Sequence, residues 1–154
     1  SGDGPYRRAV EEVIVPAVRS FRPDVIVTQD GADPHHSDPL AHLTVTMPTY
    51  PHVYRVLHEL ADEVAAGRWV ALGGGGYTFD VVPRAWALLF AEMVGAELDP
   101  QLPESWLESA RERTGQRLTP RLLDDVEPVV PEGDRARADA EGNAVVDQAA
   151  ALLR

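Results

Sequence analysis

Hydrophobic side chains recur at helical or strand spacing through most of the first 95 residues. Amphipathic helices are predicted over 5–21, 50–66 and 79–94. Two short apolar runs, RPDVIVTQ (22–29) and RWVAL (68–72), predict buried strands. Pro16 is expected to loosen the first helix because proline has no backbone N–H to donate. Alternation of helices and strands predicts an α/β fold with a parallel sheet.

The second and third helices each carry one apolar stripe, which predicts the core. The stripe of the second helix contains Val53, Val56, Leu57, Leu60 and Val64, and that of the third contains Val82, Ala85, Trp86, Leu89, Phe90 and Met93. Gly67 is expected to end the second helix. Asp80 and Pro83 suit the first turn of the third.

The remaining residues have a weaker pattern. Residues 96–123 are expected to form an extension that packs on the preceding domain. Residues 124–154 are acidic and rich in proline and glycine up to residue 142. They predict a mobile tail, with a short helix in the last dozen residues.

Composition narrows the classes of function. The chain has 154 residues with 25 acidic and 14 basic side chains, a net charge of −11, which argues against binding of nucleic acid or an anionic membrane. It has no cysteine, so a metal would need His, Asp or Glu ligands. The chain has no run of about 18 apolar residues, so no membrane span is predicted. A cytoplasmic location is expected.

Two loops are expected at one edge of the sheet, because both follow the carboxyl ends of parallel strands. The second loop, GGGGYT (73–78), admits several interpretations. A phosphate-binding loop would need a lysine, and a dinucleotide fingerprint would need glycine at Thr78. Two alternatives stay open: a structural turn, or a bare backbone that lines a channel and aims the Tyr77 hydroxyl at a developing oxyanion.

The first loop, with GADPHHSD over 31–38, offers carboxylates and imidazoles. Asp33 suits a Zn²⁺ ligand, although aspartate in a Gly/Pro loop commonly forms an Asx turn instead. His35 and His36 are adjacent, so on an extended backbone they are expected to point apart and not to bind one ion together.

Together the two loops resemble a known family. FRPDVIVTQDGADPHHSDPLAHLTVT and WVALGGGGYTFDVVPRAW resemble the C-terminal half of the zinc-dependent histone deacetylases, especially their bacterial acetoin-utilisation branch. The resemblance covers about residues 3–95. It implies a three-layer α/β/α parallel-sheet (arginase-like) deacetylase fold, incomplete in this chain, with residues 1–95 as the C-terminal part of the catalytic domain.

The resemblance also implies roles for individual residues. Asp33 aligns with a zinc ligand, and Tyr77 with the tyrosine that donates a hydrogen bond to the oxyanion. Gly75 and Gly76 align with the backbone that lines the substrate channel, and Asp38 with a recurrent aspartate expected to be structural. The implied cofactor is Zn²⁺, and the implied partners are an acetylated lysine or amine substrate and the remainder of the deacetylase domain.

The family's Asp-x-His zinc ligands and its His-His general acid/base pair lie upstream of the GAD element, and this chain carries neither pair there. The first residue is not methionine, and a helical pattern begins at once. We therefore expect a C-terminal portion of a longer zinc-dependent amidohydrolase, which alone lacks the other ligands and the base. The alternative is a truncated, non-catalytic binding or regulatory relative.

Overall fold

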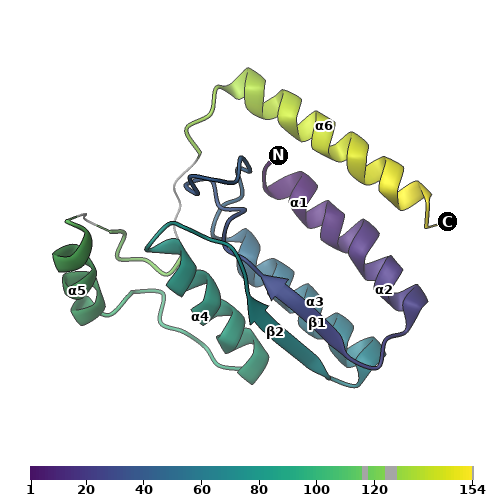
Figure 1. Ribbon diagram of the computed structural model, residues 1–154, viewed down its shortest axis with the longest axis horizontal. Helices are drawn as coiled ribbons and strands as arrows, with labels where there is room; N and C mark the ends of the chain where they lie inside the picture. The colour runs from purple at the N-terminus through teal and green to yellow at the C-terminus, as the bar shows by residue number, and fades with distance from the viewer. Residues whose placement is uncertain (116–117, 124–127, 154) are drawn as a thin grey trace.

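The computed structural model describes residues 1–115, 118–123 and 128–153, and it confirms an α/β fold with a parallel sheet. The elements in chain order are α1 (Asp3–Ala9), the π-helical segment η1 (Val10–Ile14), α2 (Val15–Phe21), β1 (Ile26–Asp30), α3 (Thr49–Ala65), β2 (Trp69–Gly73), α4 (Val81–Val94), α5 (Glu104–Thr114) and α6 (Glu132–Ala151). Figure 1 shows the two strands side by side, with α4 beyond β2 and with α1 and α2 beyond β1.

The sheet sets the position of both loops. β1 and β2 pair in parallel from Ile26↔Trp69 to Asp30↔Gly73, and α3 connects them. The last residues of the two strands are therefore partners in the register. As expected, the segments that follow them start at the same edge.

The first helix is continuous but changes its winding. α1, η1 and α2 follow one another without a break, and η1 lies immediately before the turn that contains Pro16. Proline cannot donate to the carbonyl four residues earlier, and its ring collides with that carbonyl in a regular α-helix. The wider π turn relieves this collision, so the expected loosening at Pro16 takes this form.

The core lies between α3, α4 and the sheet. Its main cluster contains Ala32, Val45, Met47, Tyr50, Tyr54, Val81, Ala85 and Leu89. The α3 stripe is confirmed at Val53, Leu57 and Leu60, which are all buried. α3 ends with Ala66 and Gly67 in left-handed conformation, the stop that Gly67 predicted.

Two residues of the α4 stripe are not in the core. Trp86 is 38% exposed and Phe90 66% exposed. Both line a hollow with Leu72 and Gly73, on the side of β2 that has no neighbouring strand among the described residues. The expectation that Trp86 and Phe90 face the core is wrong, because no described residue covers them beside the free edge of β2.

The C-terminal region is more regular than its sequence suggested. α5 was not expected, because its stretch is strongly charged and has no long apolar stripe. α6 is a helix of 20 residues and begins at Glu132, well before the last dozen residues. The part of the predicted linker from 132 to 142 is therefore helical, and 124–127 lie outside the described residues. Contacts with α1, described below, account for the longer helix.

None of the helices in the described part of the chain is both long and apolar enough to cross a membrane.

Candidate functional site

The loops after β1 and β2 contact each other through their backbones. The Ala32 amide donates to the Gly75 carbonyl across 2.7 Å. A Cβ on Gly74 would lie 2.7 Å from the Gly31 nitrogen, and a Cβ on Gly75 would lie 2.8 Å from Asp33 Cγ. These distances are shorter than any side chain permits. The glycine run is therefore required by the close approach of the chain's own GAD loop.

Gly76 is required by its conformation as well as by its surroundings. Its φ is 130°, a value that residues with a side chain rarely adopt. A Cβ there would lie 2.9 Å from Val82 Cγ2 and 3.0 Å from the Ala32 Cβ. The backbone at 74–76 thus packs tightly against the first loop and the start of α4.

Asp33 lies at the junction of the two loops. Its carboxylate is half-buried and lies against Gly31 and Gly75, at positions where a Cβ on either glycine would overlap it. Within the described residues no hydrogen bond to this carboxylate is found. Its oxygens are thus available to a cation that approaches from outside the loops.

Asp38 connects the two loops. It is 8% exposed; its Oδ1 accepts from the amides of Leu40 (2.9 Å) and Ala41 (3.0 Å), and its Oδ2 accepts from the Tyr77 amide (2.9 Å). Burial by itself raises the pKa of Asp38, but hydrogen bonds from the three backbone N–H groups, together with the nearby His35, hold the pKa below its usual value. The structural role expected for Asp38 agrees with these contacts.

Tyr77 is fixed at its backbone and open at its side chain. Its amide is held by Asp38, while the residue as a whole is 63% exposed. The phenol therefore projects from the glycine loop toward solvent. Three residues separate Tyr77 from the tightly packed start of α4 at Val81.

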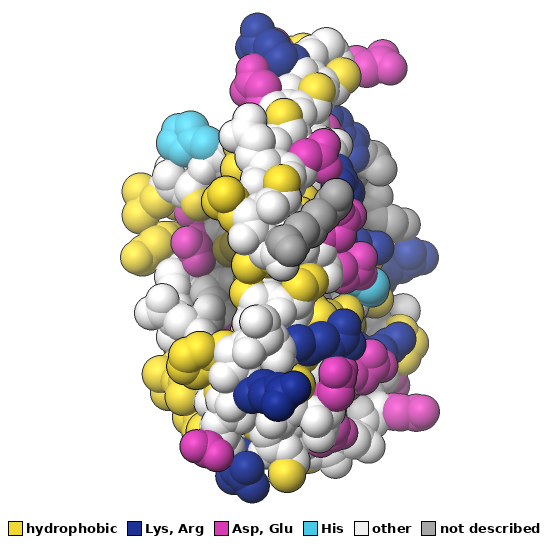
Figure 2. Space-filling view, turned by 90° about the vertical axis from the view of Figure 1, so that its right-hand side faces the viewer, with side chains coloured by type: hydrophobic (Ala, Val, Ile, Leu, Met, Phe, Trp, Pro, Cys, Tyr) yellow, Lys and Arg dark blue, Asp and Glu magenta, His cyan; other side chains and the backbone are white. Residues whose placement is uncertain are grey.

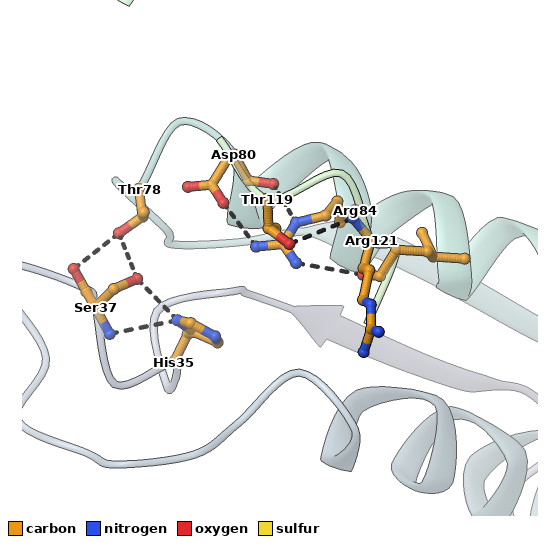
Figure 3. A network of polar contacts seen from close by, with 8 residues as sticks. His35, Ser37, Thr78, Asp80, Arg84, Thr119 and Arg121 are labelled. Carbon is orange, nitrogen blue, oxygen red and sulfur yellow. Dashed lines mark hydrogen bonds and ion pairs between the residues drawn. The ribbon is translucent and has the colours of Figure 1, made fainter. Parts of the chain in front are cut away.

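A second connection between the loops was missed by sequence reasoning. Figure 3 shows Thr78 beside Ser37, with the Thr78 hydroxyl donating to the Ser37 carbonyl (2.9 Å) and the Ser37 hydroxyl to Thr78 Oγ1 (3.3 Å). The Ser37 hydroxyl also lies 2.8 Å from His35 Nδ1. The only signal in the sequence was the presence of hydroxyl residues at turn positions.

The two adjacent histidines do not point apart. The ring centroids of His35 and His36 are 4.3 Å apart with an interplanar angle of 35°. The expectation failed because residues 33–37 form turns and a single bridge instead of an extended strand. Although Asp33-Pro34-His35 has Asp-x-His spacing, His35 is 2% exposed and its Nδ1 bonds within the loop. His35 therefore supports the loop.

The far end of the glycine loop is held by a buried arginine. Arg84 is 3% exposed; its Nη2 bonds Asp80 Oδ2 at 2.7 Å and its Nε bonds the Asp80 carbonyl at 2.9 Å (Figure 3). Its Nη1 reaches the Leu122 carbonyl at 3.3 Å. Asp80 occupies the first position before α4, as predicted, but its carboxylate pairs with Arg84 and does not cap the helix. Arg84 thereby joins the loop to the segment near residue 122.

Asp30 is a buried acid behind the two loops. It is 7% exposed, its Oδ2 accepts from the Thr28 hydroxyl at 2.6 Å, and its carbonyl accepts from the Trp86 indole at 2.9 Å. Burial raises the pKa of Asp30, and the hydrogen bond from Thr28 offsets part of that rise.

The described residues fit one part of a metal site. Structural and catalytic zinc sites use three or four protein ligands. No group of three or more His, Cys, Asp or Glu side chains among the described residues is arranged to hold a metal ion. Asp33 carries an oxygen donor of the type that zinc sites use.

Comparisons with known proteins identify related sequences. Residues 1–93 match the histone deacetylase domain family. The acetoin utilization protein AcuC of Bacillus subtilis (strain 168) is 45% identical over 103 residues, which are 66% of this chain and 26% of that protein. AcuC of Staphylococcus xylosus is 38% identical over 107 residues, 68% of this chain and 28% of that protein. The chain thus spans little more than a quarter of these relatives.

A solved structure shows the same fold. The crystal structure of the HDA15 HD domain aligns with a TM-score of 0.53 and 24% sequence identity, over 62% of this chain and 26% of that one.

Proposed function

The chain belongs to the histone deacetylase family, and from this premise we propose that it supplies one zinc ligand and the oxyanion-binding tyrosine of a deacetylase. The proposed substrate is an acetylated lysine or acetylated amine, and the reaction is hydrolysis of the acetyl-amide bond. The observation that carries the proposal is the contact between the GAD loop and the glycine loop, which keeps Asp33 and Tyr77 on one edge of the sheet.

Asp33 is proposed to hold the metal. Its carboxylate meets no hydrogen-bond donor in the described part of the chain, and a hard oxygen ligand suits Zn²⁺. Bound Zn²⁺ supplies Lewis-acid polarisation of the carbonyl and of a water molecule. The other ligands and the general base are proposed to come from a part of the deacetylase domain outside these residues.

Tyr77 is proposed to stabilise the negative charge that develops on the acetyl oxygen. The Asp38 carboxylate fixes the Tyr77 backbone, so the phenol is presented from a rigid loop instead of a mobile one. Such a preorganised donor costs little reorganisation when charge develops. Gly75 and Gly76 are proposed to line the passage for the acetyl group, in addition to accommodating Asp33 and Ala32.

The test is the Tyr77→Phe substitution in the complete protein that carries this chain. Loss of one oxyanion donor lowers kcat by about 10²- to 10³-fold in comparable enzymes. We expect that loss on an acetyl-lysine peptide or an acetylated polyamine, with zinc content and melting temperature unchanged. A kcat within about threefold of the wild type would contradict the role of Tyr77.

Tyr54→Phe is the matched control. It also removes a phenol hydroxyl, but one that is buried in α3 and has no hydrogen-bond partner within the described residues. Its kcat is expected to match the wild type. If the complete protein has no activity on either substrate but binds acetylated ligands, the non-catalytic alternative replaces this proposal.

A further inference from the structure

α6 lies outside the matched region 1–93 and runs alongside α1 and η1 (Figure 1). Three side chains of α6 contact the start of the chain. Asp139 Oδ1 accepts from the Gly2 amide at 2.7 Å, Asn143 Oδ1 accepts from Arg8 Nη1 at 2.7 Å, and Asp147 Oδ1 pairs with Arg8 Nη2 at 2.6 Å. These contacts join elements that are more than 130 residues apart in sequence.

α6 also packs closely against the start of the chain at Gly142. A Cβ there would overlap the Ser1 hydroxyl and lie 3.0 Å from Pro5 Cβ. The other glycine of the helix, Gly133, has nothing within 4 Å of its Cβ position. Glycine costs about 1 kcal/mol in a helix interior relative to alanine. The close contact with Ser1 and Pro5 explains why residue 142 is glycine. No such contact explains Gly133.

The residues that α6 contacts hold a second segment in turn. Ser1 accepts from the Thr44 amide at 3.0 Å. The Asp3 carboxylate accepts from the Thr46 amide (2.8 Å), the Thr46 hydroxyl (2.8 Å) and the Thr49 hydroxyl (2.7 Å). The start of the chain thus fixes residues 44–49, immediately before and within the first turn of α3.

Residues 44–49 lie against the GAD loop. Val45 is fully buried, its amide donates to the Pro34 carbonyl at 3.2 Å, and its carbonyl accepts from the His36 amide at 2.9 Å. Pro34 follows Asp33 directly. A continuous path of hydrogen bonds and covalent neighbours therefore leads from α6 to the proposed zinc ligand.

We propose that α6 is a brace for the Asp33 loop, and that Asp139 and Gly142 are positioning residues for it. They touch neither the substrate nor the metal. Instead they hold Ser1, Gly2 and Asp3 in place. Those three residues position residues 44–46, which in turn position the Asp33 loop. The metal consequence rests on the proposed function of Asp33, whereas the bracing of the loop does not.

The test compares Gly142→Ala with Gly133→Ala in the complete protein by amide hydrogen exchange. Both replacements favour the helical conformation, but only Gly142→Ala forces a methyl group into Pro5 and Ser1. In Gly142→Ala the amides of His36, Thr44, Val45 and Thr46 are expected to exchange about tenfold faster, with those of the β1–β2 ladder unchanged. Gly133→Ala is expected to leave all of them unchanged.

Asp139 offers a second, gentler pair of variants. Asp139→Asn keeps an oxygen acceptor for the Gly2 amide, and Asp139→Ala removes it. The same four amides are expected to exchange faster in Asp139→Ala and at the wild-type rate in Asp139→Asn. Unchanged exchange in both Gly142→Ala and Asp139→Ala, or uniform acceleration over the whole chain, would overturn the brace.

Zinc binding separates this proposal from the preceding one. The zinc Kd of Gly142→Ala is expected to rise about tenfold relative to Gly133→Ala. If wild-type zinc binding does not depend on Asp33, the proposed function fails, and the exchange rates still decide the role of α6. If zinc depends on Asp33 but its Kd is unchanged while the four amides exchange faster, the positioning of Asp33 by α6 is overturned.

Discussion

Asp38 is the residue on which the junction of the two loops depends most. Both of its carboxylate oxygens are used, Oδ1 within the first loop and Oδ2 toward Tyr77 in the second. An amide side chain cannot reproduce this arrangement, because asparagine has one oxygen and would direct N–H groups at a backbone N–H.

Asp38→Asn is therefore expected to lower the free energy of unfolding by about 1–3 kcal/mol, the usual cost of a buried donor left unsatisfied. Chemical denaturation of the two proteins measures it. Asp24→Asn is the control, since Asp24 is exposed and, among the described residues, the hydrogen bond it makes is from Arg68 to its backbone carbonyl. Equal losses in both variants would show that Asp38 does not connect the loops.

The stability difference between wild type and Asp38→Asn depends on pH because the pKa of Asp38 is lowered in the folded state. A carboxyl whose pKa is lower in the folded than in the unfolded state stabilises the fold above its unfolded pKa, and loses that effect as pH falls through the folded pKa. The stability difference between wild type and Asp38→Asn is expected to be constant near neutral pH and to shrink below about pH 4. Denaturation at pH 7, 5 and 3 measures it; a difference that grows on acidification would contradict the assignment.

At the scale of elements, the Asp80–Arg84 pair holds the end of the glycine loop against the first turns of α4. The side chain of Arg84 is 2% exposed and that of Asp80 is 20% exposed. Removing one partner of a buried pair leaves an uncompensated charge.

Asp80→Ala is expected to cost about 3 kcal/mol of stability. Glu63→Ala is the matched control, because its pair with Arg19 is as short, at 2.6 Å, but has both side chains about half exposed. An exposed pair contributes at most about 1 kcal/mol. Thermal unfolding distinguishes the two variants. A loss in Asp80→Ala no larger than in Glu63→Ala would show that the buried pair with Arg84 does not stabilise the start of α4.

Much of the arrangement of elements follows from the sequence. α3 and α4 were predicted from apolar stripes such as Val53, Leu57 and Leu60, and both strands from short apolar runs that precede a loop. The expectation that both strands are buried is wrong, because one face of the sheet is exposed at Val27 and Val70. α6 was not predicted over its whole length, because its sequence has no apolar stripe and contains two glycines; contacts of Asp139 and Asp147 with the start of the chain support it. No local pattern can indicate such contacts.

The candidate site was predicted in part, for a similar reason. The edge of the sheet and the importance of the glycines followed from strand order and from the cost of glycine in ordered backbone. What the glycines approach was not evident, because the contact of Gly74 with Gly31 depends on tertiary packing. The relative positions of His35 and His36 depended on a turn that residue types alone did not specify. The metal role of Asp33 and the oxyanion role of Tyr77 stay predictions.

At the scale of the whole molecule, one face of the sheet is apolar and uncovered by the described residues. Val27 is 61%, Val70 46% and Leu72 51% exposed, and Phe90 of α4 is exposed beside them. In Figure 2 hydrophobic side chains gather along the left edge, whereas charged side chains gather toward the right. A sheet of two strands is smaller than the usual four to six. We propose that the remainder of a deacetylase domain covers this face and completes the metal site.

Zinc content tests this account most directly. Elemental analysis is made on four purified proteins: the 154-residue chain, the complete protein, and the complete protein with either Asp33→Ala or, as an exposed control, Asp62→Ala. The account predicts zinc near one per molecule in the complete protein and its control, and little zinc in the other two, because a single carboxylate binds zinc weakly. Near-stoichiometric zinc in Asp33→Ala would contradict the central claim that Asp33 is a ligand of a shared site.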